Sequence, residues 1–368
     1  MIYDLVVVGA GIAGCSIANY AKSKGKKVLI IDRASSVATG GSGAAGAFIS
    51  PKLGKESNLL NLTNLAFNYA SKFYSKNFSQ YFDNSGIIRI LKDSKDAKNI
   101  KYYQSLIKSD SKILTLKDLK ELGIKSDVEA IYFSKGGVCD AQGLCKALIK
   151  DVNFLQLELN DIKYLNSYIL LNKEYKAKNI VLATGYEGYK DLLNYMGIKG
   201  LWGSRGDFYT TSHIKYSLHK DISISANING VVKIGATHIR AKNPCLVCDG
   251  KPLNPLINRA KELVELKSLE LKETFCGMRS GSRDYFPLVG KVIDYKIMLE
   301  DFPNIKKGFS KAPLKYLDNI YVFNGLGGRG FVFAPLLAKW LYELIFNNIE
   351  INPLVNPNRL FLKWARKL

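Results

Sequence analysis

A glycine turn between two apolar strands near the N-terminus constrains this chain most strongly. An apolar run at 5–8 leads into the turn, and a second run at 28–31 ends in Asp32. The turn reads Gly9-Ala10-Gly11-Ile12-Ala13-Gly14. Its glycines allow a tight turn, backbone approach to a pyrophosphate and close helix–strand packing, and the helix N-terminus holds the diphosphate charge. An acid about 20 residues further on can accept hydrogen bonds from a ribose, so the segment predicts dinucleotide binding rather than a chance turn.

Length and composition favour a two-domain protein with a polyanionic partner. The chain has 368 residues, 47% of them hydrophobic, which is enough to bury a large core. Its net charge of +21 suggests nucleic acid or an anionic membrane surface as a partner, although a Lys-rich codon bias would give the same balance. We find no apolar stretch of about 18 residues, so we expect no membrane span and a cytoplasmic location.

The six cysteines are too few for a disulfide scaffold in a chain of this length. Cys245 and Cys248 form a CxxC pair, and His238 and Cys276 could complete a zinc site with them. A structural zinc site normally has a second CxxC pair, which this sequence lacks. We therefore interpret these cysteines as reduced, uncoordinated thiols and expect no metal.

Three further glycine-rich turns favour a flavin over a nicotinamide cofactor. They lie at Gly40–Gly46, Leu182–Gly185 and Gly325–Gly330. A flavin ring and its ribityl arm need close backbone approach along their whole length, and only small residues allow it. Each turn alone could be an ordinary tight turn, but together they favour FAD. The last turn opens a helix whose positive end could face the pyrimidine edge of the flavin.

These turns define the expected cofactor site and domain organisation. The residues expected to bind FAD are Gly9, Ala10, Gly11, Ile12, Ala13, Gly14, Asp32, Arg33, Gly41, Ser42, Gly43, Gly46, Ala183, Thr184, Gly185, Gly325, Gly327, Gly328, Arg329, Gly330 and Phe331. The fold class is α/β, or α+β over the whole chain. We expect a Rossmann-like FAD-binding domain formed by residues 1–85, 138–200 and 277–368. A discontinuous, β-rich substrate domain comprises residues 86–137 and 201–276.

Arg279 and Arg329 are the candidate catalytic residues. Arg279 precedes a strand bounded by proline and glycine, and Arg329 lies inside the last glycine turn. A fixed guanidinium can bind a carboxylate or phosphate through two hydrogen bonds, although an arginine in a loop often only clamps carbonyl groups. We expect Arg283 to pair structurally with Asp284. The sequence also places His238 at the pocket wall, where a structural role is the alternative.

Basic residues also gather at the C-terminus. Arg359, Lys363, Arg366 and Lys367 could contact phosphates, although exposed chain ends are commonly charged.

The same motifs resemble the D-amino-acid-oxidase-type FAD oxidoreductases over nearly the full length. More narrowly, the chain is similar to the C-terminal flavin domain of the MnmC family of bifunctional tRNA 5-methylaminomethyl-2-thiouridine biosynthesis proteins. Four segments carry this closer resemblance: Gly41–Pro51 with the helix that follows, Ser282–Gly290, Gly325–Leu336 and Asn356–Leu360.

This resemblance implies an enzyme that acts on tRNA. It implies FAD-dependent oxidative removal of the carboxymethyl group from 5-carboxymethylaminomethyl-(2-thio)uridine at the wobble position, giving aminomethyl-uridine and glyoxylate. The family carries a methyltransferase ahead of the flavin domain, whereas this chain begins almost at its first flavin strand. We therefore expect no methyltransferase activity here, so that a separate methyltransferase acts next or the pathway ends at the aminomethyl stage.

Two alternatives remain open at this point. One is an FAD-dependent oxidase or dehydrogenase of a free amino acid such as glycine, sarcosine or a D-amino acid. The other is a non-catalytic, flavin-stabilised RNA-binding module.

Overall fold

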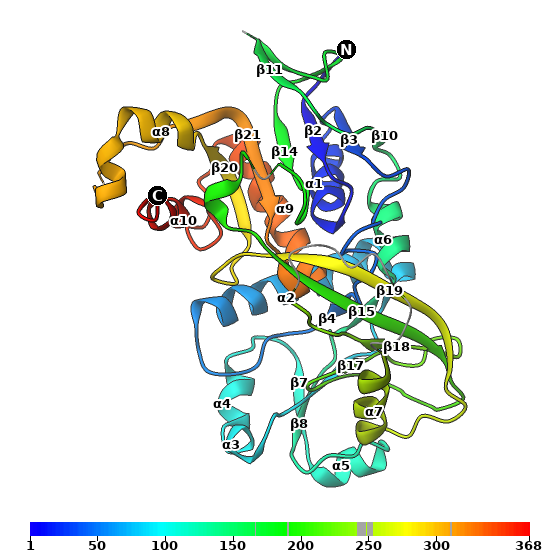
Figure 1. The fold of residues 1–368 in the computed structure, drawn as a ribbon. Helices are drawn as coiled ribbons and strands as arrows, with labels where there is room; N and C mark the ends of the chain where they lie inside the picture. The colour runs from blue at the N-terminus through cyan, green and yellow to red at the C-terminus, as the bar shows by residue number, and fades with distance from the viewer. Residues whose placement is uncertain (166, 190, 241–247, 249–252, 310) are drawn as a thin grey trace.

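The computed structural model describes residues 1–368 except 166, 190, 241–247, 249–252 and 310 (Figure 1). Its first sheet has six strands in the order β10-β3-β2-β14-β21-β20. These strands are β2 (Leu5–Val8), β3 (Val28–Asp32), β10 (Asn153–Gln156), β14 (Ile180–Leu182), β20 (Leu288–Ile293) and β21 (Tyr316–Asn324). All neighbours pair in parallel except β20 with β21, which is the mixed pattern of a doubly wound α/β fold.

Both faces of this sheet are covered, which explains why its strands are apolar throughout. On β2, Leu5 and Val7 join a core on one face, and Val6 and Val8 join a core on the other. The first face packs against α1 (Ile12–Ser23) and α9 (Gly330–Asn347), with α6 (Ala141–Leu148) lying on α1 and α2 (Asn58–Asn77) lying on α9. The second face is covered by α8 (Tyr295–Asp301), α10 (Asn358–Ala365) and a small sheet of β1 (Ile2–Tyr3), β11 (Ile162–Leu165), β12 (Tyr168–Leu171) and β13 (Tyr175–Ala177).

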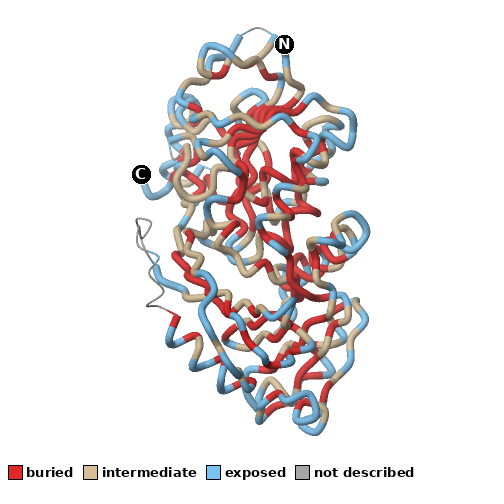
Figure 2. The backbone as a smooth tube through the Cα atoms, turned by 90° about the vertical axis from the view of Figure 1, so that its right-hand side faces the viewer, coloured by how far each residue is buried: buried red, intermediate tan, exposed pale blue. Residues whose placement is uncertain are grey.

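A second large sheet has eight strands in the order β19-β15-β18-β17-β16-β6-β8-β7. They are β6 (Ile87–Ile90), β7 (Ser111–Leu114), β8 (Ala130–Phe133), β15 (Lys199–Tyr209), β16 (Ser217–His219), β17 (Ser223–Ile224), β18 (Val231–Gly235) and β19 (Glu270–Gly281). Short helices α3 (Ser94–Ala97), α4 (Ile100–Ser105), α5 (Leu116–Glu121) and α7 (Asn254–Leu263) accompany this sheet (Figure 1). Figure 2 shows buried residues in both halves of the molecule.

The strands of the second sheet come from two separate stretches of sequence, 87–133 and 199–281. A small sheet of β4 (Phe48–Ile49), β5 (Phe82–Asp83) and β9 (Gly137–Cys139) lies where the chain enters and leaves the first stretch. The α/β class and the Rossmann-like unit are therefore confirmed. We propose that the two large sheets correspond to the two expected domains.

Local sequence signals account for some helix boundaries, and pairing within the second sheet accounts for others. Asp140 accepts a hydrogen bond from the Gly143 N–H and caps α6. The Lys- and Asp-rich sequence before residue 125 favours helix, but β7 interrupts it and pairs with β8 at the edge of the second sheet. The sequence also favours a helix over 255–268, but α7 ends at Leu263, because Val264 is extended and bridges to Ile124. None of the helices in the described part of the chain has the length and apolarity of a membrane span.

Candidate active site

A cavity of about 1090 Å³ lies between the two large sheets. The carboxyl ends of β2, β3, β14 and β21 border it from one side, and residues of β6, β16, β18 and β19 border it from the other. Doubly wound folds bind their ligands at this edge of the parallel sheet. The volume is at the upper end of the range for small-molecule sites, as an extended ligand requires.

Most of the predicted cofactor residues and both candidate arginines line this cavity. Those that do are Gly9, Gly11, Ile12, Ala13, Asp32, Arg33, Gly41, Ser42, Gly46, Ala183, Thr184, Gly185, Arg279, Gly327, Gly328, Arg329, Gly330 and Phe331. Four predicted residues, Ala10, Gly14, Gly43 and Gly325, are not among the residues that border it. They lie behind the wall: a Cβ on Gly14 would be 1.9 Å from the Gly9 carbonyl oxygen, and a Cβ on Gly43 would be 2.0 Å from the Ala38 carbonyl oxygen.

The first glycine turn brings the positive end of α1 to the cavity. Gly9 has φ +105°, and a Cβ there would lie 2.4 Å from the carbonyl oxygen of Ala183, so only glycine fits between the two strands. Asp32 accepts hydrogen bonds from the N–H groups of Ala10 (2.7 Å) and Ala34 (2.9 Å). These two bonds hold its carboxylate at the end of β3, on the cavity wall. The turn therefore offers a helix N-terminus for a diphosphate and an acid for a ribose.

The loop after β3 lies directly on β19, where only glycines allow the contact. A Cβ on Gly41 would be 2.5 Å from the Met278 carbonyl oxygen, and a Cβ on Gly277 would be 2.8 Å from the Ala44 Cβ. On the cavity side, Gly185 and Gly327 face open space, with nothing within 4 Å of a Cβ position. The glycines thus leave a cradle along the cavity that side chains would fill. This shape fits a long flat ligand such as FAD.

Arg279 is fixed to the wall of the cavity by backbone contacts. Its Nη1 donates to the Thr237 carbonyl oxygen at 3.1 Å. The guanidinium also occupies the space beside Gly203, where a Cβ would be 2.3 Å from Nη1 and Nη2. Burial lowers the pKa of Arg279, and burial together with Arg279 lowers the pKa of neighbouring His238. A guanidinium held in this way can bind a carboxylate without first ordering its own side chain.

Among the cavity residues that the sequence did not single out are two basic ones, Arg89 and His219. They are direct partners across the parallel pair β6–β16. Burial and the charge of Arg329 lower the pKa of Arg89 to about 9. Burial, together with Arg89, Arg329 and His238, holds the pKa of His219 well below its usual value, so this imidazole is neutral. The sequence signal that could have identified Arg89 is its place as the single charged residue in the apolar strand 87–90.

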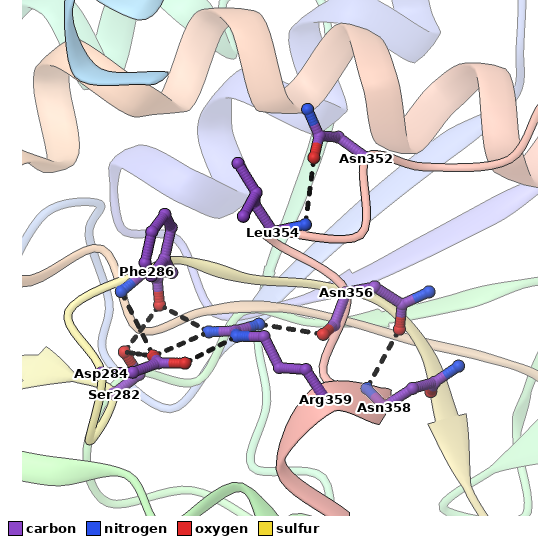
Figure 3. Close-up of polar contacts among 8 residues, drawn as sticks. All are labelled: Ser282, Asp284, Phe286, Asn352, Leu354, Asn356, Asn358 and Arg359. Atoms are coloured by element: carbon purple, nitrogen blue, oxygen red, sulfur yellow. Dashed lines mark hydrogen bonds and ion pairs between the residues drawn. The ribbon is translucent and has the colours of Figure 1, made fainter. Parts of the chain in front are cut away.

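Two expectations, the Arg283–Asp284 pair and the free thiols of Cys248 and Cys276, are wrong. Asp284 pairs with Arg359 rather than with Arg283, because α10 folds back onto the loop before β20 (Figure 3). Arg359 is thus held by a carboxylate and is not available to phosphates. Cys248 and Cys276 are not free thiols: they form a disulfide with a Cα–Cα distance of 5.8 Å, well within the usual range. Cys245 lies outside the described residues, and Cys276 borders the cavity.

Comparison with known proteins settles the enzyme class. The family profile described as "FAD dependent oxidoreductase" (DAO) matches residues 4–344. The chain belongs to this family. The protein is therefore an FAD-dependent oxidoreductase, and the resemblance seen in the sequence is confirmed.

This FAD-dependent oxidoreductase is similar in sequence to tRNA-modifying proteins and similar in fold to amino acid oxidases. The tRNA 5-methylaminomethyl-2-thiouridine biosynthesis bifunctional protein MnmC of Legionella pneumophila is 25% identical over an alignment of 370 positions, which covers 95% of this chain and 55% of the relative. The chain thus spans about half the length of that relative. Glycine oxidase from Geobacillus kaustophilus superposes with a TM-score of 0.77 at 17% identity, covering 98% of both chains. Glycine oxidase from Bacillus cereus gives 0.75 at 20% identity, over 95% of this chain and 96% of the other.

Proposed function

We propose that this oxidoreductase acts on a CH–NH group and removes the carboxymethyl group from 5-carboxymethylaminomethyl-(2-thio)uridine at the tRNA wobble position. The two-electron oxidation converts the C–N bond of the carboxymethylamine into an imine, and water hydrolyses this imine to aminomethyl-uridine and glyoxylate. FAD, held by the glycine turns and Asp32, supplies the two-electron oxidation. The chain's own residues bind and orient the substrate, because in flavoenzymes the cofactor carries the reactivity.

The fixed guanidinium of Arg279 is the observation that carries this proposal. The modified base carries an N-substituted glycine, whose carboxylate needs a cationic anchor beside the flavin. Arg279 borders the cavity, and no ion pair with a carboxylate is found for it among the described residues. Its contacts with Thr237 and Gly203 leave guanidinium donors for a substrate carboxylate. In this assignment neutral His238 and His219 border the same space without adding charge.

The tRNA part of the proposal is supported by the MnmC relatives and by the charge of +21. A polyanionic substrate gains affinity from this charge, whereas a free amino acid does not require it. Binding of tRNA and a cytoplasmic location follow from the same proposal.

Oxidation of a free amino acid is the second candidate function. The fold shared with the glycine oxidases makes it a serious alternative, since the same arginine would bind the carboxylate of free glycine. The two candidates differ in whether the amine must be attached to a nucleic acid.

The decisive experiment compares these substrates on the purified holoenzyme. Under anaerobic conditions we expect tRNA that carries 5-carboxymethylaminomethyl-uridine to bleach the visible flavin spectrum, while unmodified tRNA and free glycine do not. Nucleoside mass spectrometry should then detect aminomethyl-uridine, with one glyoxylate for each nucleoside converted. Equal bleaching by glycine would reject the tRNA proposal, and no bleaching by any candidate would support the non-catalytic alternative.

A further inference from the structure

Besides Arg279, the cavity wall carries two further arginines, Arg89 and Arg329. Arg89 lies on β6, and Arg329 is the residue that caps the N-terminus of α9. Lys52 lies close enough to both that their charges, after burial, lower its pKa. Burial likewise lowers the pKa of Arg329. Arg89 and Arg329, from distant parts of the sequence, therefore meet at the cavity wall, with Lys52 close to both.

Arg89 has no adequate partner within the described chain. Its Nε is buried and makes no hydrogen bond, and its Nη1 reaches only the Ser50 hydroxyl at a long 3.5 Å. Among the described residues, no carboxylate forms an ion pair with Arg89, Arg329 or Lys52. A desolvated cation without a counter-ion is costly, and a protein keeps one where a ligand supplies the missing charge. The arrangement therefore predicts that an anionic ligand group binds beside Arg89.

Arg89 and Arg279 lie on different strands of the second sheet, and Arg329 lies near both: it lowers the pKa of Arg89, and the Cβ position of the adjacent Gly328 is 4.0 Å from Arg279 Cδ. Arg279 lies on β19 at one edge of the second sheet, and four strands (β15, β18, β17 and β16) separate β19 from β6. Between the two arginines the wall carries His219, whose Nδ1 lies 2.9 Å from the Ser223 hydroxyl, and His238. Both imidazoles have lowered pKa values, so they add no charge between the arginines.

We propose that Arg89 and Arg329 bind a second acidic group of the substrate, a carboxylate or a phosphate, while Arg279 binds the carboxylate beside the reacting C–N bond. The assignment of Arg279 to the carboxylate beside the reacting bond rests on the proposed function. The preferred substrates are then secondary amines that carry two acidic groups. Glycine and sarcosine have only one, and they leave the Arg89 end of the site uncompensated. In a nucleotide substrate the second group is a backbone phosphate.

The test uses three matched series of N-substituted glycines on the holoenzyme. The substituent is an alkyl chain, a carboxyalkyl chain or a phosphonoalkyl chain, each with one to four methylenes, and binding is measured from the perturbation of the flavin spectrum. At the length that spans the two subsites we expect an acidic ligand to bind about 10- to 100-fold more tightly than its alkyl counterpart. A larger gain for the phosphonate points to a nucleotide phosphate, and a larger gain for the carboxylate points to a dicarboxylic amine.

Variants of Arg89 assign the gain to this residue. In Arg89→Gln the advantage of the acidic ligands should disappear while the alkyl ligands bind as before, and Arg89→Lys should restore part of it. Arg259→Gln, an exposed arginine on α7, is the matched control and should keep the full advantage. Equal affinity of acidic and alkyl ligands at every length in the wild type would overturn the second subsite. An equal loss for all three series in Arg89→Gln would also overturn it, since Arg89 would then hold the single carboxylate. Turnover of modified tRNA is measured separately, so failure of the proposed function is distinguishable from either result.

Discussion

Arg359 binds the carboxylate of Asp284 through two hydrogen bonds, from Nε to Oδ2 at 2.8 Å and from Nη2 to Oδ1 at 3.0 Å (Figure 3). The same guanidinium donates to the carbonyl oxygens of Phe286 and Asn356. Ser282 completes the cluster by donating toward Asp284 and Phe286. The pair therefore fixes α10 to the turn between β19 and β20. This turn directly follows the strand that bears Arg279.

Loss of this ion pair should lower stability in a pH-dependent way. Burial raises the pKa of Asp284, but the hydrogen bonds and charge of Arg359 outweigh burial and hold the pKa below its usual value. The side chains are 18% (Arg359) and 35% (Asp284) exposed, so solvent screening weakens the pair. We expect Arg359→Gln to cost about 1–2 kcal/mol and to lower the melting temperature by a few degrees near pH 7.

The sign of the pH effect follows from the lowered pKa. The stabilisation is complete above the pKa of an unfolded aspartate, near 4, and it is lost as the pH falls through the lower pKa of the folded state. The difference in melting temperature between wild type and Arg359→Gln should therefore be constant from pH 7 to about 5 and shrink below about 4. Arg366→Gln, at the opposite end of α10, serves as the control. A difference that grows on acidification would contradict the assignment.

Gly41 should be required for FAD retention. A methyl group there would meet the Met278 carbonyl oxygen at 2.5 Å, which pushes the loop after β3 off β19 and opens the cradle. We expect Gly41→Ala to be purified with less FAD and to release it at least tenfold faster, measured from the fluorescence of free flavin. Gly281→Ala is the matched control on β19, because no atom lies within 4 Å of its Cβ position. Equal FAD retention in both variants would remove Gly41 from the cofactor site.

Local patterns in the sequence predicted the cofactor end of the site, while the substrate end depended on tertiary contacts. The turn at 9–14 and Asp32 could be recognised because their spacing is fixed within one strand–helix–strand unit. Arg89 could not be placed, since the strand β16 that pairs with it lies about 130 residues further on. The partner of Asp284 was missed for the same reason, because it comes from a helix 75 residues away whereas the predicted partner was adjacent in sequence.

The disulfide between Cys248 and Cys276 should be detectable in the purified protein. We expect alkylation under denaturing, non-reducing conditions to leave these two cysteines unlabelled and joined as one peptide pair in mass spectrometry. Cys15, Cys139 and Cys145 are buried and free, so they should be labelled only after unfolding. Disulfides are rare in reducing compartments, which makes this measurement informative about where the protein works. Full labelling of Cys248 and Cys276 without reductant would contradict the pairing.

Binding of tRNA should depend steeply on salt. A protein that neutralises several phosphates loses affinity as counterions compete, and the net charge of +21 provides the cations. We expect the dissociation constant measured by gel shift to rise at least tenfold between about 50 and 200 mM salt. A salt-independent interaction would count against a phosphate-binding surface.

Arg279 should set substrate affinity through the geometry of its guanidinium. Arg279→Gln removes the charge and both parallel donors, so we expect kcat/KM to fall about 10²- to 10³-fold. Most of this loss should be a rise in KM, because the carboxylate is bound equally in the ground state and the transition state. Arg279→Lys keeps a charge but loses the planar fork and the anchoring bond to Thr237, and it should recover only part of the activity. FAD content measured in each variant separates substrate binding from cofactor loss. Arg283→Gln, on the loop that follows β19, is the control and should leave the kinetics unchanged. If Arg279→Gln retained wild-type KM and kcat with full FAD occupancy, the carboxylate would have to bind elsewhere, and the assignment of this arginine would be wrong.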